Sequence, residues 1–243
     1  METSESAVGG DEPTPALGHP FPEFVDWIAG FAIAVVGLAL LVGGTALTFV
    51  VDREMIREDI EAGEITVIVF ERELTEAQML EFTVEVVDWT GIGLLVTGAG
   101  LALFAAVFVA VRHRARGAVE DGESAGSYLS SAVLGAIATT VLSFIPLSPV
   151  VGGGLAGYLE GDETGRSISV GGVSGLMAMI PGIAILLFVT VGLYNGLATV
   201  DEGDFGILVA TAMLLVVLVV AAYGSGLGAL GGFAGGRLSE RQP

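Results

Sequence analysis

The chain has 243 residues, of which 53% are hydrophobic and only 15% are charged, a balance too apolar for an ordinary soluble domain. Its net charge of −19, with nine arginines and no lysine, argues against nucleic-acid binding, which requires basic patches. Because cysteine is absent and His19 and His113 are the only histidines, we expect no disulfide, no metal site and no cofactor. Acid-rich, lysine-free composition is typical of a halophilic archaeal protein, since molar salt screens the repulsion between carboxylates.

The charges are separated by long uncharged stretches. These run over residues 27–51, 89–111, 124–159, 167–200 and 205–236. Each reaches the ~20 residues that a helix needs to cross a hydrocarbon core about 30 Å thick. The sequence therefore predicts an all-α integral membrane protein with about six membrane segments, one of which could be re-entrant, and a small extramembrane region. The lipid bilayer is its expected partner.

The N-terminal half is predicted to be a disordered acidic tail, residues 1–26, followed by a two-helix membrane module over residues 27–111. The first span, 27–51, is expected to stay uncleaved, because no basic region precedes it. The external segment 52–88 of this module begins with a short amphipathic helix that ends at Gly63.

The rest of the external segment contains a candidate strand and a helix start. Residues 64–70 are rich in β-branched residues, and a lone strand there would pair with another copy, pack on the membrane surface or be irregular. Thr75 and Gln78 fit a capping box, and Leu74 could staple onto Met79. The helix that starts there is expected to run into the second span, 89–111.

A linker over residues 112–126 is predicted to separate this module from a glycine-rich four-helix membrane domain, residues 127–238, and a tail, 239–243. Prolines are expected to interrupt the helices of that domain. Pro146 and Pro149 divide the third stretch into helices near 128–145 and 149–159, the second of which is short enough to be re-entrant. Pro181 is expected to kink a helix over 167–198, and the last helix spans 205–236.

The arginines suggest an orientation. Arg112, Arg114 and Arg116 follow the second span directly, and short basic loops stay in the cytoplasm. This places both termini in the cytoplasm and segment 52–88 outside, provided that 128–159 forms a hairpin or a re-entrant pair. A single span over 128–159 would instead place Arg237 and Arg241 outside, so we favour the six-segment topology at the cell membrane.

Glycine gives the clearest motif, with 37 residues in the chain. Four-residue spacing aligns glycines in one stripe of a helix, which lets a second backbone come close. The glycines predicted to pack helices in this way are Gly153, Gly157, Gly171, Gly175, Gly224, Gly228, Gly232 and Gly236. We favour packing within one chain and keep a homo-oligomer seam as the alternative.

Nothing in the sequence predicts an enzyme. The predicted spans contain no ionisable residue, and no serine has a histidine that could serve as its base. The G-x-G-x-x-G pattern at Gly226–Gly231 lacks the acidic residue that a dinucleotide site requires about 20 positions later. No small-molecule ligand is indicated.

A resemblance supports the domain division. Residues 145–158 (IPLSPVVGGGLAGY), the pair Gly171–Gly175 and the terminal glycine ladder resemble a haloarchaeal family of four-helix membrane domains of unknown function, over about residues 128–238. The resemblance implies four membrane helices, of which the second is short, and no activity. We interpret the chain as a non-enzymatic structural or assembly subunit. The alternative is a small transporter or channel component that uses the broken segment 145–159, with Ser143, Ser148 and Thr190 lining a polar cavity.

Overall fold

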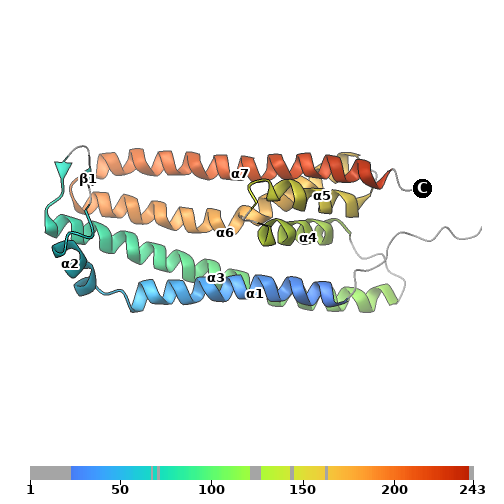
Figure 1. The fold of residues 1–243 in the computed structure, drawn as a ribbon, viewed down its shortest axis with the longest axis horizontal. Coiled ribbons are helices and arrows are strands. Elements are labelled where there is room, and N and C mark those ends of the chain that lie inside the picture. Colours follow the sequence, from blue (N-terminus) through green and yellow to red (C-terminus); the bar gives the residue numbers. More distant parts are fainter. Residues whose placement is uncertain are drawn as a thin grey trace, which may run out of the picture.

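The structure is a computed structural model that describes residues 23–66, 68–69, 72–120, 127–142, 145–161 and 164–240. Most of the predicted disordered tail and most of the predicted C-terminal tail lie outside these residues. The described residues form helices and one small hairpin (Figure 1). In chain order these are α1 (Glu23–Phe49), α2 (Arg53–Glu61), β1 (Ile68–Val69), β2 (Arg72–Glu73), α3 (Glu76–Glu120), α4 (Ser127–Val141), α5 (Ser148–Glu160), α6 (Thr164–Thr199) and α7 (Gly203–Ser239).

Four helices are long and apolar enough to cross a membrane. Their candidate spans are Gly30–Val50, Glu76–Ala110, Gly165–Thr199 and Gly203–Ser239. The helical fold class is therefore confirmed, and the composition fits a multi-pass membrane protein. The predicted count of about six membrane segments is not confirmed, because α4 and α5 have only 15 and 13 residues, about 22 and 20 Å of helix.

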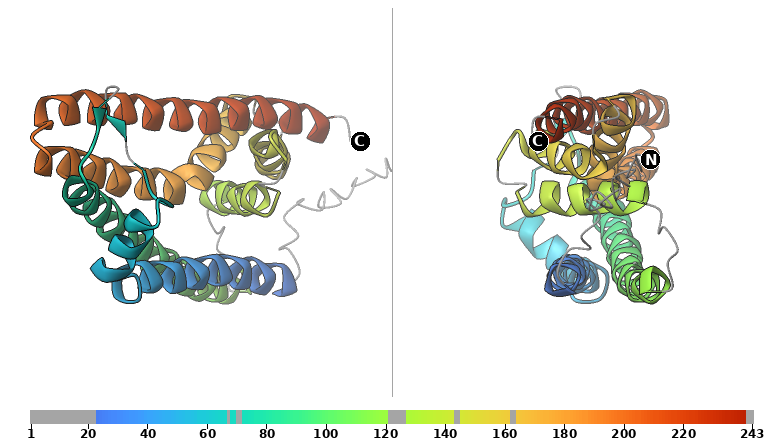
Figure 2. Two further views of the ribbon diagram at one scale, coloured as in Figure 1. Left: turned by 60° about the vertical axis from the view of Figure 1, so that its left-hand side comes forward. Right: turned by 90° about the vertical axis from the view of Figure 1, so that its right-hand side faces the viewer.

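Two pairs of long helices make up most of the bundle, and the two short helices, α4 and α5, lie at one end of it (Figure 1). α1 packs along α3, and α6 packs along α7, while α3 crosses obliquely from α6 to α1 (Figures 1 and 2). α3 meets α6 near the end of the molecule that carries α2, where Gly93 faces Phe188 and Gly196 faces Phe82. Toward the other end the two helices diverge. There α4 lies between the pair α6–α7 and the pair α1–α3, whereas α5 packs on α7, α6 and α4 (Figures 1 and 2). With 15 and 13 residues, α4 and α5 are less than half as long as α6 and α7.

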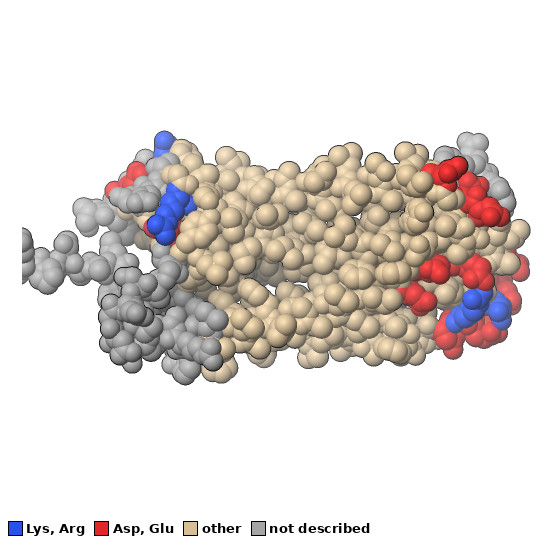
Figure 3. Space-filling view, turned by 180° about the vertical axis from the view of Figure 1, so that it is seen from behind, with Lys and Arg blue, Asp and Glu red and all other residues tan. Residues whose placement is uncertain are grey.

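On the face shown in Figure 3, the charged side chains of the described residues lie at the two ends of the molecule and not in the band between them. One end, which we call the acidic end, comprises residues 52–88 and the turn between α6 and α7. The other, the C-terminal end, carries the start of α1, the end of α3, the turn between α5 and α6, and the C-terminus (Figure 1). An uncharged band between two charged ends is the arrangement that a bilayer requires.

The amphipathic helix at the acidic end forms where the sequence predicts it. Asp52 caps α2 by accepting a hydrogen bond from the Met55 N–H, 2.9 Å away, and Gly63 takes a φ of 75° after the helix. The apolar face of α2, with Ile56 and Ile60, packs on Leu80 of α3. The amphipathic helix is thus confirmed, and its apolar face packs against the first turns of α3.

The capping box at the start of α3 is also confirmed. The Thr75 Oγ1 accepts a hydrogen bond from the Gln78 N–H at 3.3 Å, and the Gln78 Oε1 accepts one from the Thr75 N–H at 3.2 Å. Leu74, next to it, is 5% exposed. α3 then continues without interruption into the second span, as expected.

The candidate strand has a partner that the sequence analysis did not consider. Ile68–Val69 pairs antiparallel with Arg72–Glu73 in a two-stranded hairpin, with Ile68 opposite Glu73 and Val69 opposite Arg72. The strand is therefore not alone, since its partner lies in the same chain. The hairpin connects α2 to α3 at the acidic end.

Candidate functional site: the glycine-lined helix interface

The last helix buries glycine and nothing larger. All residues of α7 that are buried are glycines: Gly206, Gly224, Gly228, Gly231, Gly232, Gly235 and Gly236. Leu215 and Leu218 of the same helix, by contrast, are more than 60% exposed. The contact surface of α7 within the bundle is therefore mostly backbone.

One stripe of these glycines faces α6. A Cβ atom on Gly228 would overlap the carbonyl oxygen of Gly171, and one on Gly232 would overlap that of Ser167. The contact is reciprocal, because a Cβ on Gly175 would overlap the Gly224 carbonyl oxygen. Close backbone approach of this kind favours van der Waals contact and weak Cα–H···O bonds.

Further glycines connect α7 to α5. A Cβ on Gly153 would overlap the Gly228 carbonyl oxygen, and one on Gly157 would overlap that of Gly232. Gly231 and Gly235, one position before the main ladder, approach the carbonyl oxygens of Val150 and Gly154. The structure thus brings all eight predicted packing glycines into one interface among α5, α6 and α7 of a single chain.

The sequence analysis missed a second glycine interface, between α1 and α3. Gly37 lies against Gly98, and Gly44 lies against Gly91. In both helices the two glycines are seven residues apart, which places them on one face. That spacing was the available signal, and a search for four-residue spacing alone does not find it.

A third close contact joins α4 to α5 and α6. A Cβ on Gly152 would overlap both the Thr139 hydroxyl and the Gly135 carbonyl, and one on Gly135 would overlap the Ser174 hydroxyl. The Thr139 hydroxyl donates to the Gly135 carbonyl at 3.0 Å. The Ser174 hydroxyl is fully buried and has no hydrogen-bond partner in the described part of the chain.

The predicted helix breaks lie where the backbone changes course. α4 ends at Val141, and α5 begins at Ser148 with Pro149 in its first turn, where the missing N–H costs nothing. The Tyr223 hydroxyl of α7 donates to the Pro146 carbonyl in the intervening turn. Pro181 lies inside the continuous helix α6, which bends part-way along its length (Figure 2).

The arginines predicted to set the orientation all lie on α3. Arg112, Arg114 and Arg116 follow the candidate span, which ends at Ala110. The helix continues to Glu120, so the first nine residues of the predicted linker are helical. The C-terminal end also carries Arg237, whose guanidinium lies 4.1 Å from the centre of the Phe233 ring.

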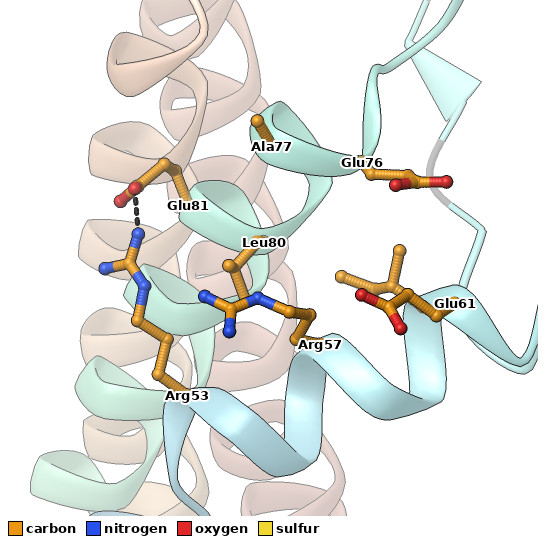
Figure 4. A pocket seen from close by; sticks show the side chains of 8 residues that line it. Arg53, Arg57, Glu61, Glu76, Ala77, Leu80 and Glu81 are labelled. Carbon is orange, nitrogen blue, oxygen red and sulfur yellow. Dashed lines mark hydrogen bonds and ion pairs between the residues drawn. The ribbon is translucent and has the colours of Figure 1, made fainter.

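A shallow hollow of about 360 Å³ lies at the acidic end between α2 and α3 (Figure 4). Its floor contains Ile60 and Leu80, and its two arginines are already paired, Arg53 with Glu81 and Arg57 with Glu54. These pairs are about half exposed and stabilise the joint only weakly. The residues that line the hollow are the ones that join α2 to α3.

Within the described residues no group of three or more acidic or histidine side chains is placed to hold a metal ion. Residues 129–238 match the family model of a family of unknown function, DUF5518. The DUF5518 region begins in α4 and ends in α7, so it contains the glycine interface of α5, α6 and α7. The predicted resemblance over about residues 128–238 is confirmed to that extent. No curated protein and no solved structure matches the chain.

Proposed function

We propose that the protein is a non-enzymatic structural or assembly subunit of the cell membrane. The observation that carries this proposal is the glycine interface, in which α5, α6 and α7 meet backbone to backbone. Such contact leaves no room between these helices for a substrate. It yields a closely packed unit that exposes large apolar side chains, among them Leu215 and Leu218, between its charged ends.

The polar groups of the bundle support the same role. The hydroxyls of Thr139 and Thr190 donate to carbonyls four residues earlier in their own helices, at 3.0 and 2.7 Å. Threonine in membrane helices commonly bonds in this way and is then unavailable to a solute. No charged side chain of the described residues lies in the central band visible in Figure 3.

The transporter alternative has less support. Of the three residues expected to line a polar cavity, Ser148 is 5% and Thr190 is 7% exposed, and Ser143 lies outside the described residues. The hydroxyl of Thr190 already has its partner within α6. Because transporters also use interrupted helices such as segment 145–159, a solute-flux assay is the direct way to distinguish transport from the structural role.

For the topology we propose that α4 and α5 form a re-entrant pair that enters and leaves on the cytoplasmic side. Four full spans and this pair give the six segments expected from the sequence. Both termini and the arginines of α3 then face the cytoplasm, and the acidic end faces outward. The short lengths of α4 and α5 and their position in the C-terminal half of the bundle support this arrangement (Figure 1).

The role is tested by reconstitution and by co-purification. Purified protein in liposomes should release trapped ions and small solutes no faster than empty liposomes. Extraction of the tagged protein from its native membrane in a mild detergent should recover it in a complex with defined stoichiometry. Solute flux that depends on the protein, together with recovery of the free monomer, would contradict the structural role and favour transport.

The re-entrant pair is tested by cysteine accessibility, for which the cysteine-free chain is suited. Leu147→Cys places the thiol in the exposed turn between α4 and α5, and Glu58→Cys is the control at the acidic end. In intact membranes an impermeant maleimide should label residue 58 from outside and residue 147 from neither side. Labelling of residue 147 from outside would show that α4 crosses the whole bilayer.

A further inference from the structure

The hollow between α2 and α3 at the acidic end has the size of a small-molecule site. Its volume of about 360 Å³ lies within the range of ~300–1,000 Å³ that ligand pockets occupy. Residues of α2 and of the first turns of α3 line it (Figure 4). Ile60 packs on Leu80 at its floor, so the floor is apolar and the two helices are held together there.

The charged side chains around the hollow are separated by sign. In Figure 4 the carboxylates of Glu61 and Glu76 lie on the right, and the guanidinium groups of Arg53 and Arg57 lie to the left of both. Glu81 also lies on the left, where it pairs with Arg53. One side of the hollow is therefore acidic, and the other keeps one basic group after this pairing.

The residues that line the hollow do not neutralise these charges. The partner of Arg57 is Glu54, which is outside the lining. Because a guanidinium has five N–H donors, Arg57 keeps donors for a second acceptor. Within the described part of the chain, no ion pair and no side-chain hydrogen bond involves Glu61 or Glu76. Both sides of the hollow can therefore bind a group of opposite charge.

This distribution of charge restricts the chemistry of a ligand. Glu61 and Glu76 would repel a phosphate or a nucleotide, and Arg57 would repel a simple amine. No three acidic or histidine side chains of the described residues are grouped to hold a metal ion. A molecule with one negative and one positive group, by contrast, meets an opposite charge on each side.

We propose that the hollow binds a small zwitterion whose carboxylate and ammonium groups are joined by a short apolar chain. Arg57 donates to the carboxylate, and Glu61 and Glu76 accept from the ammonium group. The apolar chain lies over Ile60 and Leu80. The existing ion pair of Arg57 is about half exposed and weak, so the ligand displaces it at little cost. The proposal concerns the acidic end alone and is independent of the structural role proposed for the glycine interface.

The ligand class is tested with a series of probes. Full-length protein in lipid nanodiscs is titrated with the ω-amino acids from glycine to ε-aminocaproate, and binding is followed by saturation-transfer NMR. At least one of them should bind saturably. Valerate and pentylamine each lack one of the two charges and should bind about tenfold more weakly than the best zwitterion, since each loses one charge-assisted contact. Binding of pentylamine as tight as that of the best zwitterion would overturn the proposal, as would binding by none of the series.

Substitutions test the assigned residues. Arg57→Gln and Glu76→Gln should each weaken binding of the best zwitterion several-fold, and both side chains are exposed, so the variants should fold. Glu58→Gln is the matched control, because it makes the same change of charge at an exposed position of α2 outside the hollow. It should bind like the wild type. An equal loss for Glu58→Gln and Glu76→Gln would mean that the acidic end attracts the probe through its overall charge, which would overturn the site.

Discussion

Two glycines of α7 that are two positions apart have opposite surroundings. Gly228 is buried, and a Cβ there would overlap the Gly171 carbonyl oxygen and come within 3.1 Å of the Gly175 backbone. Gly226 is exposed, and a Cβ there would meet nothing within 4 Å. Because both residues are in the same helix and differ by one methyl group from alanine, they form a matched pair for measuring the value of close backbone contact.

Gly228→Ala should destabilise the protein by about 1–3 kcal/mol, as overpacking does in other closely packed interiors. Gly226→Ala should be neutral or stabilising by up to about 1 kcal/mol, because alanine has the higher helix propensity. Unfolding of both variants in detergent, followed by circular dichroism, measures the difference. Equal stability of the two variants would mean that α7 moves away from α6 without penalty.

Asp201, in the turn between α6 and α7, has a φ of 64°, a conformation that suits glycine better than aspartate. The turn is closed by the Glu202 N–H, which donates to the Leu197 carbonyl at 2.9 Å, as at many helix C-termini. Asp201→Gly should therefore stabilise the protein by about 0.5–1 kcal/mol, after the entropy that glycine adds to the unfolded chain.

The control for this substitution is Asp204→Gly. Asp204 lies in the first turn of α7, where a carboxylate interacts favourably with the helix dipole and glycine is a poor helix former. Its replacement should lower the melting temperature, whereas Asp201→Gly should raise it. A lower melting temperature for both variants would contradict the interpretation of the turn.

At the scale of elements, the helices differ in uncharged length. The uncharged parts of α1 and α3, residues 27–49 and 89–111, each correspond to about 35 Å of helix, close to the thickness of a hydrocarbon core. Those of α6 and α7, residues 167–199 and 205–236, correspond to about 50 and 48 Å. Helices this long must tilt or bend to fit. The bend in α6 is consistent with that requirement (Figure 2).

The start of α3 is an element-scale feature with a simple test. Thr75→Ala removes the hydroxyl that accepts the Gln78 N–H, and loss of such a cap costs about 1 kcal/mol. Because α3 is 45 residues long, the effect should be local fraying without global unfolding. Hydrogen exchange at Gln78 and Met79 should accelerate, while exchange in the membrane part of α3 stays unchanged. Protection that is unaltered at Gln78 would show that the tertiary contacts of Leu74 and Leu80 hold this turn unaided.

The helix ends could be predicted because local chemistry determines them. Asp52, Gly63 and Thr75 end or begin helices through their own backbone conformation or through hydrogen bonds to residues only a few positions away. The prolines limit α4 and α5 because proline lacks a backbone N–H and has a fixed φ. The depth of α4 and α5 could not be predicted, since it depends on the angle between α3 and α6. The partner of β1 was missed because a two-residue strand has too little pattern to be recognised.

The candidate interface was predictable to a similar degree. The four-residue spacing of the α7 glycines is enough to identify one stripe of that helix. It does not identify the neighbours, which are α6 for Gly228 and α5 for Gly231, because that choice depends on how the chain returns through α5. The contact of Gly135 with Ser174 lies between helices whose relative orientation no local pattern encodes.

At the scale of the whole molecule, the distribution of charge is asymmetric. Among the residues whose side chains are described, the acidic end carries the arginines Arg53 and Arg57 amid many carboxylates, whereas the C-terminal end carries Arg166 and Arg237 with few (Figure 3). Arg166 forms an ion pair with Glu160, whose side chain is 2% exposed. Because the two ends differ in their basic residues, the protein is expected to insert into a bilayer in one orientation.

Replacing Arg112, Arg114 and Arg116 with serine should lower the fraction of molecules that insert in the proposed orientation. These arginines directly follow a span, and short basic segments are retained in the cytoplasm. A cysteine in place of Glu58 reports the side of the acidic end. In the wild-type background it should be labelled from outside only; in the triple variant part of the population should lose that label. The triple substitution Arg53, Arg57 and Arg72 to serine is the control, since it removes the same charge from the opposite end and should leave the labelling unchanged. Labelling of residue 58 from the cytoplasmic side in the wild-type background would reverse the proposed orientation of every span.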